Sequence, residues 1–365
     1  MGAIWRRSLG EDACHVAGRP ALEGDRWWVY ISTRDGVGKS RIGRLVVDTS
    51  LLANGGGARV LELHPEPVLS LGEMGTFDDS GVMPSWLVDD GGAQLLYYIG
   101  WNVIGTVPYR LSIGLAISED GGQTFRRRFQ GPIIDRSIQE PFFATAPCVI
   151  RENDKWRMYY ASCTGWESIL GRWEPRYHVK YAASAYGIHW ELTGRSCIEA
   201  GPDEAIGRPC AFRHANGYAM LYSRRSIAGY RTKRENSYRL GYADSADGIS
   251  WSPKESEVGI ERSDEGWDAE MMEYCWVQQE GLGTYLLYNG NGFGATASGW
   301  LDSVASLEDF PPHVALLAFK RNERTAFFAY QPRPVLRKSP NRERLRTARA
   351  TGASPLTLPA LSRVR

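Results

Sequence analysis

The sequence predicts an all-β fold, a five-bladed β-propeller whose blades are four-stranded antiparallel sheets. Three observations predict it: short apolar runs rich in Tyr recur five times, Asp/Gly turns separate them, and 40 Gly with 19 Pro favour tight turns over long helices. A hydrophobic content of 43% and an aromatic content of 12% supply a sizeable core. A chain of 365 residues is long enough for one large β domain.

Each apolar run carries a tyrosine that marks the repeat. The marker tyrosines are Tyr30, Tyr98, Tyr160, Tyr222 and Tyr288, at intervals of 68, 62, 62 and 66 residues. Another apolar segment and a polar turn precede the marker run, which indicates a hairpin, and third and fourth strands follow in the best-defined units. Four strands in roughly 60 residues is the size of a propeller blade with long loops. We therefore expect the markers on equivalent strands.

The repeat also predicts the domain organisation. Residues 1–332 form the propeller, with blades near residues 12–60, 77–130, 140–195, 204–255 and 268–310 and a closing segment to residue 332. Residues 327–330 favour one more strand. Residues 333–365 carry nine Lys/Arg and one acid, which predicts a basic, flexible tail.

Charge and cysteine usage exclude several classes of function. A net charge of +1 argues against a nucleic-acid partner. The six cysteines lack metal-ligand spacing, so we interpret them as reduced thiols and expect no metal and no other cofactor. The first ten residues lack the apolar run of a signal peptide, and no stretch is apolar enough for a membrane span. We expect a cytoplasmic location.

Two turns share a pattern that resembles the Asp-box of sialidases. One covers Ser118 to Phe125, and a shorter version covers Ser245 to Trp251. An Asp at the start of such a turn accepts backbone N–H bonds, and its Gly supplies a positive φ. We interpret both turns as structural.

Acids recur where the inner strands begin, and inner strands meet at one mouth of a propeller. Converging carboxylates repel one another and resist burial, so their recurrence indicates function. Glycoside cleavage needs such groups, an acid of raised pKa and an opposing carboxylate. The residues at these positions include His15, Asp78, Asp79, Glu140, Glu204, Asp268, Glu270 and Glu273.

The pattern resembles the glycoside hydrolase superfamily of five-bladed propellers, which includes families 32, 43, 62, 68, 117 and 130. Within it, segments such as Phe77–Val82, Gln139–Phe142, Gly266–Asp268 and Tyr288–Gly294 are similar to uncharacterised members found with bacterial surface-polysaccharide genes. The acid that family 43 places before a Pro on the first inner strand is missing from Ala17–Pro20, and the family 32 signature is missing too.

The resemblance implies a glycoside hydrolase whose catalytic residues are Asp79, Glu140, Glu204 and Asp268. We assign Glu140 or Glu204 as the acid and Asp79 as the opposing carboxylate. The expected substrate-binding residues are His15, Asp78, Arg208, Arg231, Trp267, Glu270, Glu273, Tyr274, Asn289 and Asn291.

The expected partner is a carbohydrate. The guanidinium group of Arg can donate two parallel hydrogen bonds to a carboxylate or phosphate, which suits an acidic or phosphorylated sugar. Two alternatives stay open. A glycoside phosphorylase resembling family 130 would use phosphate in place of water, and a non-catalytic propeller would only bind sugar.

Overall fold

The structure is a computed structural model that describes residues 16–20, 25–50, 59–153, 155–214, 217–280, 283–293, 298–303, 314–318 and 327–328. By its internal contacts the chain divides into residues 1–330 and residues 331–365. The expected basic tail, residues 333–365, lies outside the described residues. Among those residues, no helix has the length and the hydropathy needed to cross a membrane.

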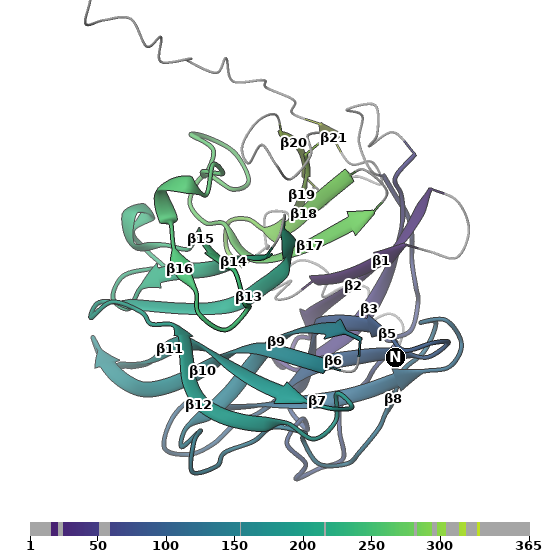
Figure 1. The fold of residues 1–365 in the computed structure, drawn as a ribbon, viewed down its shortest axis with the longest axis horizontal. Coiled ribbons are helices and arrows are strands. Elements are labelled where there is room, and N and C mark those ends of the chain that lie inside the picture. Colours follow the sequence, from purple (N-terminus) through teal and green to yellow (C-terminus); the bar gives the residue numbers. More distant parts are fainter. Residues whose placement is uncertain are drawn as a thin grey trace, which may run out of the picture. The chain divides into compact units, whose positions relative to one another are not determined.

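The strands form five successive blades, which Figure 1 shows in chain order around a common centre. Pairing within each blade is antiparallel, and one parallel bridge, Ser40 with Gly81, joins the first two blades into a single sheet. The first two blades are β1 (Val16–Pro20), β2 (Arg26–Arg34), β3 (Ser40–Asp48) and β4 (Arg59–Leu63), then β5 (Gly81–Asp89), β6 (Gln94–Asn102), β7 (Arg110–Ser118) and β8 (Arg126–Arg127). The third is β9 (Phe143–Glu152), β10 (Lys155–Ile169), β11 (Arg172–Ser184) and β12 (Glu191–Ile198).

The fourth and fifth blades follow the same order. The fourth is β13 (Glu204–His214), β14 (Gly217–Ser226), β15 (Arg239–Ser245) and β16 (Ser252–Pro253), and the fifth is β17 (Glu273–Glu280), β18 (Gly283–Asn289), β19 (Ser298–Ser303) and β20 (Val314–Ala318), extended by β21 (Phe327–Phe328). Two short 3₁₀ helices, η2 (Arg234–Asn236) and η3 (Glu255–Glu257), lie in the fourth blade's loops. The predicted fold class is confirmed.

The inner strands contact one another around the ring. Strand β5 contacts β1 and β9, β13 contacts β9 and β17, and β17 contacts β1. Every inner strand therefore has an inner neighbour on both sides, the arrangement that propellers use to protect their sheet edges.

The marker tyrosines lie on the second strand of their blades, as the repeat predicts. Tyr30, Tyr98, Tyr160, Tyr222 and Tyr288 belong to β2, β6, β10, β14 and β18. All five side chains are buried. The tyrosine repeat therefore marks the positions where one blade packs against the next.

Three tyrosines donate a hydrogen bond to the last turn of the following blade. Their acceptors are glycine carbonyl oxygens: Tyr30 to Gly122 at 2.8 Å, Tyr97 to Gly187 at 2.8 Å, and Tyr159 to Gly248 at 2.7 Å. Each glycine has a positive φ, of 95°, 72° and 71° in turn. A Cβ at any of them would lie within 3 Å of the tyrosine oxygen, so the turns require glycine.

The two Asp-box turns prove to be structural. Asp120 accepts hydrogen bonds from the Ser118 hydroxyl at 2.6 Å and from the backbone N–H of Gln123 at 2.9 Å. Asp247 accepts backbone bonds from Ile249 and Ser250, each at 2.8 Å. Burial raises the pKa of Asp120, but hydrogen bonds outweigh it and hold that pKa at about 2.

Candidate active site at the ring centre

The buried acids at the heads of the inner strands are anchored to the marker tyrosines. The hydroxyl–carboxylate pairs are Tyr98 with Asp78 at 2.9 Å, Tyr160 with Glu140 at 2.8 Å, and Tyr288 with Asp268 at 2.9 Å. In every pair the acid precedes the tyrosine of its own blade by 20 residues. The recurrence of these acids thus has a structural cause, because each one satisfies a buried hydroxyl group.

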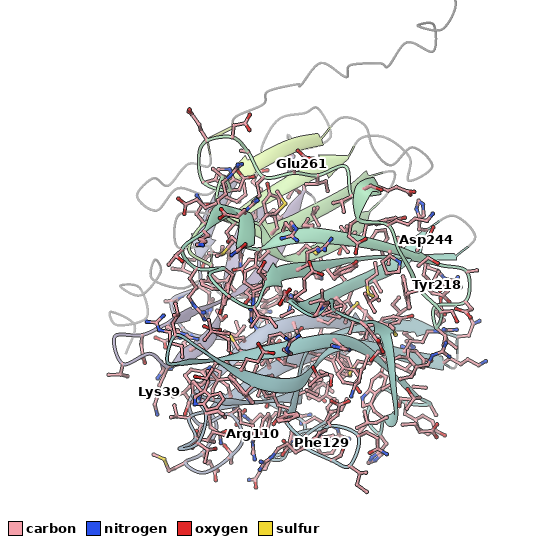
Figure 2. The ribbon with its side chains drawn as sticks, turned by 90° about the vertical axis from the view of Figure 1, so that its left-hand side faces the viewer. Lys39, Arg110, Phe129, Tyr218, Asp244 and Glu261 are labelled. Carbon is pink, nitrogen blue, oxygen red and sulfur yellow. The ribbon has the colours of Figure 1, made fainter. Side chains whose placement is uncertain are left out.

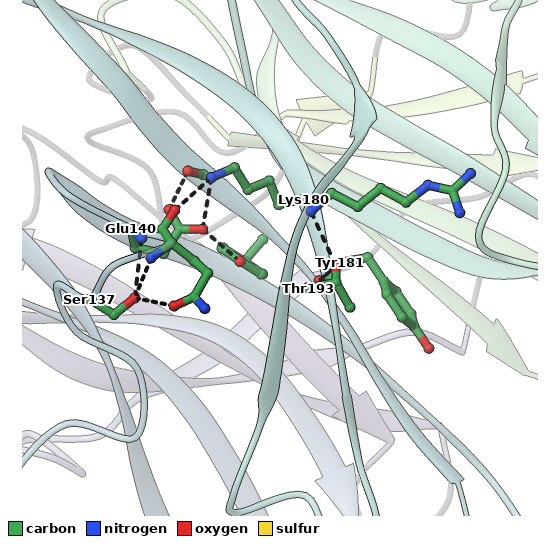
Figure 3. A network of polar contacts seen from close by, with 9 residues as sticks. Ser137, Glu140, Lys180, Tyr181 and Thr193 are labelled. Carbon is green, nitrogen blue, oxygen red and sulfur yellow. Dashed lines mark hydrogen bonds and ion pairs between the residues drawn. The ribbon is translucent and has the colours of Figure 1, made fainter.

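Two of these acids also bind a cation. Arg127 Nε lies 2.8 Å from Asp78 Oδ2, and Lys180 Nζ lies 3.0 Å from Glu140 Oε1. The Ser162 hydroxyl donates to the other oxygen of Glu140, and Figure 3 shows Lys180 beside that carboxylate. These contacts fix both acids within the framework of their blades.

Asp79 and Glu204 are more open to solvent. Asp79 is partly exposed and accepts a hydrogen bond from the Ser80 hydroxyl at 2.9 Å. The Glu204 side chain is 25% exposed and forms ion pairs with Arg224 and, at 3.1 Å, with Arg239. The hydrogen bonds and ion pairs of the described residues join none of the four predicted catalytic acids to another, so their joint role stays a prediction.

Several predicted binding residues organise the loop before β17. Asn291 Oδ1 accepts the backbone N–H of Glu270 at 2.8 Å, and Asn291 Nδ2 donates to the Gly266 carbonyl at 2.9 Å. The Trp267 ring stacks on Tyr288 with centroids 5.0 Å apart. Glu270 is exposed. His15 lies outside the described residues.

A β-bulge interrupts the inner strand of the third, fourth and fifth blades at the same place. A non-glycine residue with positive φ sits in each bulge: Ala146 at 50°, Arg208 at 49° and Tyr274 at 54°. Such residues are uncommon and tend to cluster at functional sites. Their spacing of 62 and 66 residues equals that of the markers, so the bulge belongs to the repeat.

The bulges border a cavity of about 70 Å³ that four blades line. Met83, Thr145 and Gly207 line it from three successive inner strands. Each pairs with the residue that follows a marker tyrosine. Glu273 occupies the same register position in the fifth blade, where it pairs with Asn289.

Arg208 and Trp86 fill the centre of the ring beside the bulges. Arg208 lines the cavity and donates to the Ser85 hydroxyl at 2.7 Å and to the Ser85 carbonyl at 3.2 Å. Trp86 packs against the clusters of buried residues between the later blades, and its ring lies 6.4 Å from that of Trp276. The cavity is therefore bordered by packed side chains near the ring axis.

A second arginine enters the cavity from β14. Arg225 is 1% exposed, and its guanidinium carbon lies 3.8 Å from the centroid of the Tyr230 ring. Arg225 Nε donates to the Tyr238 hydroxyl at 3.0 Å, and Nη2 donates to the Pro175 carbonyl at 3.2 Å. Together with Tyr274, these rings form an aromatic wall next to a buried cation.

Glu174 connects this wall to the third blade. Its two carboxylate oxygens accept hydrogen bonds from the Tyr230 hydroxyl at 2.9 Å and from Arg231 Nη1 at 2.7 Å. Arg231 is 42% exposed, so the predicted binding residue lies at the outer rim of the cluster.

Glu273 is an acid whose pKa is raised by burial. The residue is fully buried. Burial raises the pKa of this carboxyl group well above its ordinary value, although Arg225, the Tyr274 side chain and Arg231 act in the opposite direction. A buried carboxyl group in this environment favours its protonated form.

Sequence reasoning missed Glu174, Tyr238 and Trp86. The available signal was the interval: Met83, Thr145, Gly207 and Glu273 repeat with the spacing of the markers. That alignment singles out the one ionisable residue among the four positions.

Comparisons with known proteins identify relatives of the chain. No family model matches it. It is 36% identical over 280 residues to the uncharacterized proteins MT1551 and Rv1502 of Mycobacterium tuberculosis, which covers 76% of this chain and 88% of each relative.

Similar solved structures share the fold. A thermostable family-43 glycoside hydrolase has a TM-score of 0.56 at 15% identity, over 89% of this chain and 96% of that one. A glycosyl hydrolase from Bacteroides ovatus has a TM-score of 0.56 at 18% identity, over 77% and 82%. The fold is therefore that of the propeller glycoside hydrolases, and the chain belongs to the family of the Mycobacterium tuberculosis proteins MT1551 and Rv1502.

Proposed function

We propose that the chain binds a carbohydrate at the centre of the propeller and cleaves a glycosidic bond there, with Glu273 as the proton donor. One observation carries the proposal. Glu273 is buried, and it occupies the strand position at which Met83, Thr145 and Gly207 of the other blades line the cavity. A glycosidase needs a carboxylic acid that holds its proton near neutral pH, and the raised pKa of Glu273 meets this need.

In this reaction the proton of Glu273 passes to the glycosidic oxygen as the bond from that oxygen to the anomeric carbon breaks. Water adds to the anomeric carbon and gives up a proton to an opposing carboxylate. Asp79 and Glu204 are the candidates for that carboxylate, because their side chains are partly exposed. Glu140 and Asp268 suit it less, since their burial and their tyrosine partners serve the fold.

A screen of aryl glycosides and bacterial polysaccharide fragments, with products identified by NMR, tests the proposal. Once a substrate is found, Glu273→Gln should lower turnover by roughly 10²–10⁴-fold, since it keeps the shape but loses the transferable proton. The control Glu261→Gln changes an exposed acid and should keep full turnover. Full activity of Glu273→Gln would refute this assignment.

Sugar binding without cleavage is the second candidate function. The observation in its favour is that Asp78, Glu140 and Asp268 each have a structural partner. Saturable binding of a glycan in calorimetry, with no product and no effect of Glu273→Gln on affinity, would establish this function instead.

A further inference from the structure

Two buried arginines line the same small cavity. Arg208 is 2% exposed and Arg225 is 1% exposed, and both border the space of about 70 Å³ between the bulges. Cations are rarely buried unless their charge is used or compensated. Two buried cations on one cavity therefore favour an anionic occupant.

Neutral groups hold Arg225 in place. Its guanidinium donates to the Tyr238 hydroxyl, the Ser226 carbonyl at 3.0 Å and the Pro175 carbonyl. A guanidinium has five N–H donors in a rigid fork, and three described bonds leave part of the fork for a ligand. Such a fork matches the two oxygens of a carboxylate or phosphate.

Among the described residues, neither nearby acid forms an ion pair with Arg225. Glu174 binds Tyr230 and Arg231 instead. Glu273 is the ionisable residue at the cavity register, and its burial favours the neutral form. Met83, Thr145 and Gly207, at the equivalent positions, carry no charge.

The cavity volume limits what can enter. The volume is about 70 Å³, and one water molecule needs about 10–15 Å³ of such space. The cavity therefore has room for several water molecules, or for a small oxyanion in their place.

We propose that this cavity is a subsite for a small oxyanion, a carboxylate or phosphate group, held by the Arg225 guanidinium, with Arg208 as a second cation on the cavity wall. The inference rests on the proposed function, because the anion is taken to belong to a sugar substrate or to its co-substrate. The expected ligand is therefore an acidic sugar or free phosphate.

Calorimetry on the full chain separates these sources. The probes are inorganic phosphate, glucuronate and glucose, of which the last two share a ring and differ in the carboxylate. We expect saturable binding of phosphate or glucuronate and no binding of glucose. Release of a sugar phosphate that depends on added phosphate would identify free phosphate as the natural source of the bound anion. Equal affinity for glucose and glucuronate, or no binding of either anion, would overturn the proposal.

Variants locate the bound anion. Arg225→Lys keeps the charge but loses the fork and should weaken anion binding by roughly 10–100-fold, the worth of one charged hydrogen bond. Arg208→Lys provides a second test if the first variant does not fold, and Arg126→Gln alters an exposed arginine as the control. Unchanged affinity in a folded Arg225→Lys would contradict the proposed position. Anion binding in a chain that cleaves no glycoside would keep this inference while refuting the proposed function.

Discussion

The Arg208 guanidinium donates a hydrogen bond to the Ser85 hydroxyl oxygen at 2.7 Å, although the two residues belong to inner strands that the third blade separates. The Ser85 hydroxyl in turn donates to the Pro147 carbonyl of that third blade at 2.7 Å. One buried serine thus connects three blades at the centre of the ring. Figure 2 shows Lys39 and Tyr218 on opposite sides of the molecule.

Ser85→Ala should destabilise the fold. The change removes a hydroxyl partner from a buried cation and leaves the Pro147 carbonyl without its donor, which should cost about 1–3 kcal/mol. Urea unfolding followed by fluorescence measures the loss. The exposed Ser252→Ala is the control, and equal stability of the two variants would mean that the connection contributes nothing.

Gly187→Ala should disrupt the contact between the second and third blades. A Cβ at Gly187 would lie 2.6 Å from the Tyr97 hydroxyl oxygen, and the φ of 72° is strained for alanine. We expect a loss of about 1–3 kcal/mol, measured by thermal unfolding. Gly36→Ala has no atom within 4 Å of the new Cβ and should be close to neutral. A Gly187→Ala variant as stable as Gly36→Ala would contradict the role of these turns.

Glu140→Gln separates a structural from a catalytic role for the recurring acids. Breaking a buried ion pair leaves Lys180 uncompensated, which should cost about 3–5 kcal/mol of unfolding free energy. Glu167→Gln removes a partly exposed pair with Arg176 and should cost no more than about 1 kcal/mol. Denaturant unfolding compares the two. Unchanged stability of Glu140→Gln combined with lost turnover would instead support the catalytic role that the sequence predicts.

Much of the fold was predictable because one contact recurs in it. The marker tyrosines are buried and recur once per blade, so their spacing records the blade length. The turn glycines are required by the hydroxyls of Tyr30, Tyr97 and Tyr159. The exact bounds of the blades stay a prediction. Residues 294–297 and 304–313 lie outside the described residues.

The candidate site was less predictable because a repeating acid has two physical causes. Position alone does not separate a carboxylate that accepts a tyrosine hydroxyl, as in Glu140, from one that faces a ligand. The bulges decide which side chains reach the cavity, and they depend on a backbone conformation that Arg208 and Tyr274 do not intrinsically favour. Sequence reasoning thus found Glu273 as one acid among many, and the strand register shows why its place in the 62–66-residue interval matters.

The buried Glu273 carboxyl group should leave a signature in the pH dependence of stability. Its pKa in the folded chain is raised well above the value of about 4.3 expected in the unfolded chain. Between these two values the folded state binds more protons, so the free energy of unfolding falls as pH rises, by up to about 1.4 kcal/mol per pH unit. The contribution is fully present below the unfolded pKa and is lost as pH rises towards the folded pKa.

Glu273→Gln cannot ionise, so this decline should be absent from its unfolding curve measured by urea titration between pH 4 and 8. The comparison uses the slope against pH, because the absolute stability of the variant also reflects how the new amide is accommodated. Glu261→Gln, at an exposed position, should keep the wild-type slope. If wild-type protein and Glu273→Gln show the same slope, the Glu273 carboxyl group is ionised in the folded chain. In that case it has no proton to donate near neutral pH, and the opposing carboxylate and proton donor must be sought among Asp79 and Glu204.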